Sequence, residues 1–108
     1  MSGRLPAADC RTLDAIRAGI DDIDRQVIAL LGERYGYVQA AAAFKRDADA
    51  VRAPERLASM LRQRRDWATQ AGLSADVIEQ LYRQLVDYFI AAEMRHWQDA
   101  AELSPPAA

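Results

Sequence analysis

The chain has 108 residues, of which 51% are hydrophobic and 28% charged, which is the composition of one ordinary globular domain. Its 14 basic and 16 acidic residues leave a formal net charge of -2, and the basic residues are spread along the chain, so no nucleic-acid partner is expected. Apolar runs such as Val27 to Leu31 are far shorter than the roughly 20 residues that cross a bilayer, and the N-terminal segment has no signal-peptide core. We therefore expect a cytoplasmic protein without a membrane partner.

Cysteine and histidine are too few for a structural metal or a disulfide framework. The chain has one cysteine, Cys10, and one histidine, His96. We interpret Cys10 as a reduced bystander, and His96 as a surface residue or a partner of a helix C-terminus. No metal and no cofactor are predicted.

Hydrophobic periodicity predicts a long first helix from about Thr12 to about Arg46. Its apolar residues follow a 3,4,3,4,3 spacing, typical of an amphipathic helix: Leu13, Ile16, Ile20, Ile23, Val27 and Leu30. Thr12 is the expected N-cap, and Asp14 suits the first turn. The segment 47–53 is predicted to be a loop, because the residue before Pro54 disfavours the α region.

Two further helices are predicted after Pro54. The second carries an inward face and ends at Ala71-Gly72, and Ser74 caps the third, which runs to about Ala100. The second helix carries Leu57, Met60, Leu61, Arg64 and Trp67. The expected inward residues of the third are Ile78, Leu81, Leu85, Tyr88, Phe89 and Ala92. We interpret the aromatic residues of the third helix as core.

The length of the first helix predicts a homodimer. About 35 residues span roughly 50 Å, whereas a compact domain of this size has a radius of gyration near 13 Å. The C-terminal half of the first helix therefore carries an apolar face that another element must bury, most simply the same face of a second copy related by a two-fold axis. We expect an all-α, intertwined dimer, with a flexible segment 1–11, a helical domain 12–101 and a disordered tail 102–108.

Two cations are predicted on the apolar side of the first helix. Continuing the spacing beyond Leu30 reaches Arg34, and Lys45 lies close to three turns later, about 16 Å further along the axis. Burying either cation alone is costly, so acidic side chains or an anionic ligand must satisfy them. Spacing alone leaves both interpretations open.

Arg17 lies roughly 25 Å from Arg34 along the helix, too far for both to hold one small ligand within one chain. An antiparallel partner helix would bring Arg17 of one chain towards Arg34 and Lys45 of the other. The alternative is a solvated Arg17 paired with Asp21 at i+4.

Two carboxylates are also candidates. Glu93 flanks the face of the third helix that carries Phe89, and an ion pair with an inward arginine is the simplest explanation of this position. Glu55 follows Pro54 in the first helical turn, where a carboxylate commonly faces the positive end of the helix dipole.

In this order on three helices, these residues resemble the all-α class of chorismate mutases, and more closely its isochorismate pyruvate lyase branch. The resemblance covers about Asp9 to Trp97. It rests on the ordered combination of Ile16-Arg17, Ile20-Asp21, Ile23-Asp24, Leu31-Gly32-Glu33-Arg34, Tyr37-Val38, Phe44-Lys45, Ala53-Pro54-Glu55-Arg56 and Ile90-Ala91-Ala92-Glu93.

The resemblance implies an intertwined homodimer in which Arg17 of the opposite chain binds one carboxylate of a dianionic substrate. Arg34 would bind the other carboxylate, and Lys45 would donate a hydrogen bond near the ether bond that breaks. Such a pericyclic reaction needs no nucleophile, metal or proton relay, because cations that hold the reactive conformer suffice. The implied catalytic residues are Lys45, Glu93 and Arg34, and the implied substrate-binding residues are Arg17, Arg34, Lys45, Val51, Glu55, Phe89 and Glu93.

Two positions depart from the family pattern. Many members have glutamine where this chain has Glu93, and a carboxyl must be protonated before it can donate to the ether oxygen. Some mutases of the class use glutamate there, so Glu93 favours a mutase. Typical mutases carry a substrate-binding arginine where this chain has Pro54, so Pro54 favours a lyase whose loop 47–53 acts as a lid, with Val51 or Arg52 near the ligand.

The first expectation is a chorismate mutase that forms prephenate. The alternative in the same site is an isochorismate pyruvate lyase that forms salicylate and pyruvate. A further alternative is a non-catalytic helical dimer that binds a metabolite or a partner enzyme, although Arg17, Arg34 and Lys45 argue against it.

Overall fold

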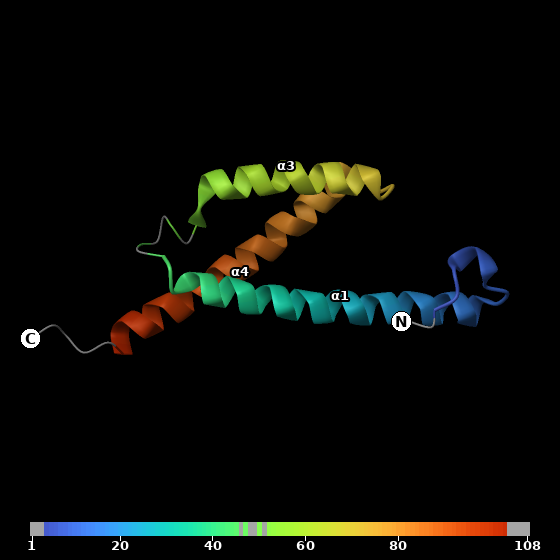
Figure 1. Cartoon of the computed structure of the whole chain (residues 1–108), viewed down its shortest axis with the longest axis horizontal. Coiled ribbons are helices and arrows are strands. Elements are labelled where there is room, and N and C mark those ends of the chain that lie inside the picture. Colours follow the sequence, from blue (N-terminus) through green and yellow to red (C-terminus); the bar gives the residue numbers. More distant parts are fainter. Residues whose placement is uncertain (1–3, 46, 48–49, 51, 104–108) are drawn as a thin grey trace, which may run out of the picture. The chain divides into compact units, whose positions relative to one another are not determined.

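The computed structural model describes residues 4–45, 47, 50 and 52–103, with the side chains of 96, 97 and 99–103 also left undescribed. The described residues form three long α-helices: α1 (Leu13–Ala42), α3 (Pro54–Gln70) and α4 (Ala75–Leu103), preceded by a short 3-10 helix, η1 (Ala7–Asp9) (Figure 1). Because no strand occurs in these ranges, the predicted all-α class is confirmed. None of these helices contains an apolar stretch of the length that a membrane crossing requires.

The chain divides into two compact units, Met1–Tyr37 and Val38–Ala108. In the first unit, the predicted cap of α1 is confirmed: the backbone N–H of Ala15 donates to Thr12 Oγ1 at 3.0 Å. The segment before α1 is held to it by an ion pair of 2.8 Å between Arg4 and Asp22. The N-terminal part of the chain is thus attached to the side of its own helix.

The apolar stripe of α1 stays exposed in the single chain. Its six predicted members, from Leu13 to Leu30, keep between 41% and 61% of their surface accessible, and no described residue of the first unit is buried. A contiguous apolar face of this length is unusual on a soluble monomer. The observation supports the argument that a second chain covers the stripe.

The end of α1 differs from the prediction. The helix ends at Ala42 and not near Arg46, which itself lies outside the described residues. The next three backbone N–H groups, those of Ala43, Phe44 and Lys45, bond to the carbonyl three residues earlier, which tightens the last turn. The alanine-rich sequence here has no glycine or proline to mark this end, so the periodic pattern extended the helix too far.

In the second unit, both ends of α3 agree with the prediction. Pro54 occupies its first turn, preceded by Ala53 in the left-handed conformation (φ 43°). At the other end Gly72 has φ +79°, and the N–H groups of Gly72 and Leu73 donate to the carbonyls of Thr69 and Ala68. This Schellman arrangement turns the chain into α4.

The packing of α3 against α4 forms the core of this unit (Figure 1). Ser74 caps α4, because its hydroxyl accepts a hydrogen bond from the backbone N–H of Val77. The buried residues are Ala42, Met60, Leu61, Ala68, Phe89, Ala92 and Glu93. Leu81 and Tyr88 are predicted to point inward but are 52% and 60% exposed. Their positions have the predicted helical spacing, but spacing alone does not show whether a helical face is covered.

Charged residues also connect α3 to α4. Arg65 forms ion pairs with Asp76 (2.8 Å) and Glu79 (3.1 Å), and Glu79 pairs with Arg83 at 2.9 Å. The hydrogen bond from Arg83, assisted by Arg65, holds the pKa of Glu79 below its ordinary value of 4.5. The hydrogen bond to Asp76 raises the pKa of Arg65.

This network predicts an acid-dependent contribution to stability. Because the pKa of Glu79 is lower in the folded chain, its contribution is present above about pH 4.5 and is lost as the pH falls through the folded pKa. Glu79→Gln should therefore flatten the dependence of the unfolding free energy on pH in that acidic range. Urea titrations at several pH values test this, with exposed Asp87→Asn as the control. Equal acid dependence in wild type and Glu79→Gln would contradict the prediction.

Candidate active site

Lys45 does not occupy a helical position. It follows the end of α1, so the three-turn spacing that placed it on the same side as Arg34 does not apply. Its backbone N–H is held by the carbonyl of Ala42 at 3.2 Å, and its side chain is 23% exposed. The structure therefore places a partly buried ammonium group directly at the end of the helix.

Glu93 is the partner of this ammonium group. The distance between Lys45 Nζ and Glu93 Oε1 is 2.8 Å, and the Glu93 side chain is 2% exposed. The partner of Glu93 is therefore a lysine and not the inward arginine that the sequence predicts. Lys45 follows the end of α1 and Glu93 lies on α4, far away in the sequence, so no local pattern could have paired them.

The surroundings of Glu93 on α4 are apolar. Phe89, one turn earlier, is 4% exposed, and the adjacent Ala92 is 7% exposed. Apart from the ion pair with Lys45, Oε1 accepts no hydrogen bond from the described residues. Burial of a carboxylate costs several kcal/mol unless it is paired, so its negative charge depends on Lys45.

The predicted loop 47–53 is partly helical. Ala50 and Arg52 have helical conformation, and the N–H of Ala50 donates to Asp47 Oδ1 at 2.8 Å, as at a helix N-cap. The sequence signal for this helical segment is Asp47, an aspartate placed three residues before Ala50 as at a helix N-cap, and the predicted loop did not take it into account. Val51 lies outside the described residues, and Arg52 is exposed.

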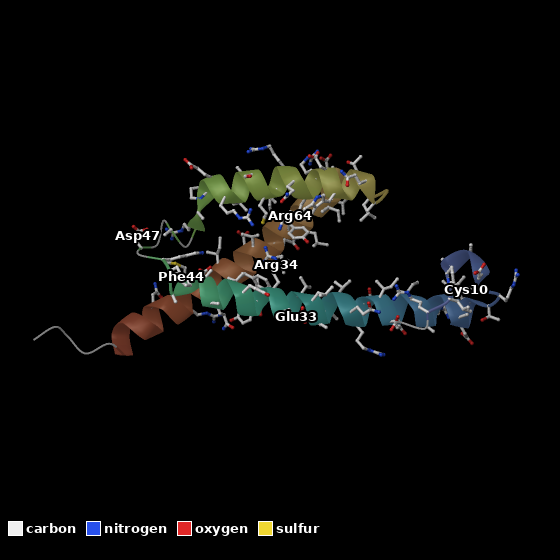
Figure 2. The ribbon with its side chains drawn as sticks, viewed as in Figure 1. Cys10, Glu33, Arg34, Phe44, Asp47 and Arg64 are labelled. Atoms are coloured by element: carbon white, nitrogen blue, oxygen red, sulfur yellow. The ribbon has the colours of Figure 1, made fainter. Side chains whose placement is uncertain are left out.

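Glu55 lies in the first turn of α3, as predicted, and its side chain is exposed. It forms no ion pair with a described residue, so it is available to a ligand or to solvent. Arg64 lies further along α3 (Figure 2). Its guanidinium is 4.7 Å from the ring centroid of Trp67 and 5.9 Å from that of Tyr82. The contact with Tyr82 joins α3 to α4, whereas Trp67 belongs to α3 itself.

The two arginine candidates belong to the first unit. Arg34 is half-buried on α1, and Arg17 is exposed near the start of the same helix. Arg17 forms no ion pair with any described residue, so the suggested pairing with Asp21 is not found. Of the seven predicted site residues, the structure brings together Lys45 and Glu93, with Phe89 on the same face of α4.

The described residues contain no group of three or more acidic, histidine or cysteine side chains placed to hold a metal ion. The pair that the structure does show can offer an ammonium donor and a carboxyl group to an anionic ligand. Its chemistry is therefore hydrogen bonding and charge stabilisation.

Residues 16–94 match the family described as chorismate mutase type II. The chain is 42% identical over 90 residues to an isochorismate pyruvate lyase from Pseudomonas aeruginosa, an alignment that covers 83% of this chain and 89% of the relative. It is 37% identical over 75 residues to the T-protein of Haemophilus influenzae, covering 68% of this chain and 20% of that protein. The first alignment thus extends over most of both proteins, and the second over a minor part of the T-protein.

Proposed function

The chain belongs to the chorismate mutase type II family, and from this premise we propose that it cleaves isochorismate into salicylate and pyruvate. The observation that carries this choice is the similarity to an isochorismate pyruvate lyase over 83% of this chain and 89% of the relative. From the sequence alone, chorismate rearrangement is the first expectation. The extent of this similarity, together with Pro54 in place of an arginine, reverses the order.

Conversion of chorismate to prephenate is the second candidate, in the same site. It is favoured by Glu93, which stands where mutases of this class can have glutamate. Both reactions break the ether bond of a dianionic substrate without adding or removing any atom overall. An enzyme for either one must hold a compact conformer and stabilise negative charge on the ether oxygen.

Lys45 and a protonated Glu93 are the proposed donors to that oxygen. The 2.8 Å contact between them supports this assignment, because it places both polar groups at one point in an otherwise apolar part of the unit. Arg34 is proposed to bind one carboxylate of the substrate as a two-pronged donor. The remaining proposed substrate-binding residues, which would contact the substrate ring and its hydroxyl group, are Phe89, Val51 and Glu55.

Arg17 is proposed to reach the site from a second copy of the chain. Two observations support a homodimer: the apolar stripe of α1 is exposed along its length, and Arg17 has no ion-pair partner among the described residues. Residues 12–101 are the proposed helical domain of each copy. The partner would cover the stripe and supply the cation for the second carboxylate.

Product identification tests the proposal. The purified protein is incubated separately with isochorismate and with chorismate, and products are identified by NMR against uncatalysed controls. We expect salicylate and pyruvate from isochorismate, formed faster than any prephenate from chorismate. Formation of prephenate alone would establish the second candidate. If neither substrate is converted, the result would favour a non-catalytic dimer.

A further inference from the structure

The N-terminal arm, residues 4–11, covers one line of residues along the start of α1. From residue 12 to residue 30 every position is exposed except three half-buried ones, Ala15, Gly19 and Asp22. Their spacing of four and then three residues places them on one side of the helix. The described part of the first unit consists of this arm and α1, so the arm is the segment that covers the line.

Arg4 fastens the arm to this side of α1. Its Nη1 lies 2.8 Å from Asp22 Oδ2, and its alkyl stem runs past Gly19, where an added Cβ would be 3.9 Å from the Cγ of Arg4. Asp22 Oδ2 also accepts a hydrogen bond of 3.1 Å from Gln26 Nε2. The arm is thus docked on α1 at about its third turn by a charged contact and an apolar one.

The docked arm opposes fraying of the turns that carry Arg17. A helix unravels from its ends, and a helix with little tertiary packing is marginally stable. No described residue of the first unit is buried, so α1 has little packing here. While Arg4 holds Asp22, unravelled residues between them form a closed loop, which gains less chain entropy than a free end. Arg17 lies within that loop, so the ion pair stabilises the helical backbone that directs its side chain.

The arm leaves Arg17 itself uncovered. At about 100° per residue, Arg17 lies about 160° around the helix from Gly19 and about 140° from Asp22. The apolar stripe of α1 lies between these two sides, with Ile16 near its centre. Arg17 is exposed on one flank of the stripe and the arm occupies the other flank. A second copy can therefore pack on the stripe and receive Arg17 without displacing the arm.

We propose that the N-terminal arm is a strap, and that Arg4 is a positioning residue for Arg17 in the partner's site. This inference rests on the proposed function, in which Arg17 binds a substrate carboxylate across the dimer. Arg4 does not touch the substrate and acts by keeping the first turns of α1 helical. A fixed carboxylate is bound equally in the ground state and the transition state, so loss of the strap raises KM more than it lowers kcat.

Charge reversal at Arg4 tests the strap kinetically. Arg4→Glu places two carboxylates together, and we expect KM for isochorismate to rise about threefold to fivefold while kcat changes less than about twofold. Arg4→Glu/Asp22→Arg restores an ion pair of opposite polarity and should return KM to near the wild-type value. Arg11→Glu, the same charge change at an exposed arm residue, is the matched control and should leave KM unchanged. In an Arg17→Ala background, Arg4→Glu should have no further effect, because the residue through which it acts is absent.

Cys10 reports docking of the arm without any substrate. It is the single cysteine of the chain and is partly buried, with its Sγ 3.7 Å from the carbonyl oxygen of Pro6. The rate of its alkylation by iodoacetamide, an uncharged reagent, measures how often the arm leaves α1. We expect alkylation to be several-fold faster in Arg4→Glu and near the wild-type rate in Arg4→Glu/Asp22→Arg, whereas Arg11→Glu should not accelerate it.

The outcomes separate this inference from the proposed function. Salicylate formation with the same KM in wild type and Arg4→Glu would overturn the inference and leave the activity intact. A rise in KM that persists in the Arg17→Ala background, or that Asp22→Arg does not reverse, would overturn it equally. Equal alkylation rates in wild type and Arg4→Glu would show that Arg4 does not hold the arm. If wild type converts neither substrate, the proposed function fails and the positioning role fails with it.

Discussion

Replacement of Arg34 by alanine is expected to lower kcat/KM for isochorismate by about 100- to 1,000-fold, because it removes two charge-assisted hydrogen bonds to a substrate carboxylate, each contributing about 1.5–2 kcal/mol. Arg34 is half-buried on α1, where a guanidinium is less screened than on an open surface. Its planar fork matches a carboxylate with two parallel hydrogen bonds. Steady-state kinetics on Arg34→Ala and Arg34→Lys measures how much of kcat/KM depends on the positive charge and how much on the bidentate hydrogen bonding of the guanidinium.

Arg34→Lys should recover part of the loss, because lysine keeps the charge but not the bidentate geometry. Exposed Arg25 on the same helix provides the matched control, and Arg25→Ala should remain within a few-fold of wild type. Light scattering must show that Arg34→Ala keeps the oligomeric state of wild type. Unchanged kcat/KM in Arg34→Ala would remove Arg34 from the site, and loss of the oligomer would indicate a structural role instead.

Replacement of Lys45 by methionine is expected to destabilise the fold by about 3 kcal/mol, because it leaves Glu93 buried without a counterion. This value is at the low end for buried pairs, since the Lys45 side chain is 23% exposed while that of Glu93 is 2% exposed. In Lys45→Met/Glu93→Met both charges are removed and apolar groups of similar length fill the space. We expect the double variant to recover most of the lost stability.

Urea denaturation at one protein concentration measures these differences, since a dimer's stability depends on concentration. The exposed pair of Glu79 and Arg83, at 2.9 Å, offers the matched control, and Arg83→Met should cost less than about 1 kcal/mol. Two results would contradict this account of how Lys45 stabilises the buried charge of Glu93. One is that Lys45→Met lowers the free energy of unfolding no more than Arg83→Met does. The other is that Lys45→Met/Glu93→Met is no more stable than Lys45→Met.

The parts of the fold that sequence reasoning predicted are those set by short-range signals. Thr12, Ser74 and Gly72 each mark a helix end through a hydrogen bond or a backbone conformation available to few residue types. The apolar stripe of α1 was predicted for the same reason, since helical periodicity is local. Its exposure in the single chain could not be read from periodicity, which shows a face but not what covers it.

The site was less predictable because it depends on contacts between distant segments. Lys45 was assigned to a helical face, although the helix ends three residues earlier in a run of alanines that contains no stop signal. The buried position of Glu93 was expected from its spacing on the third helix, but its partner was not. A pairing between the end of α1 and the middle of α4 depends on how the second unit packs.

The central claim is that each site combines residues of two chains, and mixing two inactive variants tests it directly. Arg17→Ala and Arg34→Ala are unfolded together, refolded as a mixture and assayed with isochorismate. If Arg17 acts across the dimer, half of the dimers are mixed and each has one intact site, so about a quarter of wild-type activity should return. If Arg17 and Arg34 of one chain served the same site, every site would lack one arginine, and activity no higher than that of the two parents would contradict the claim.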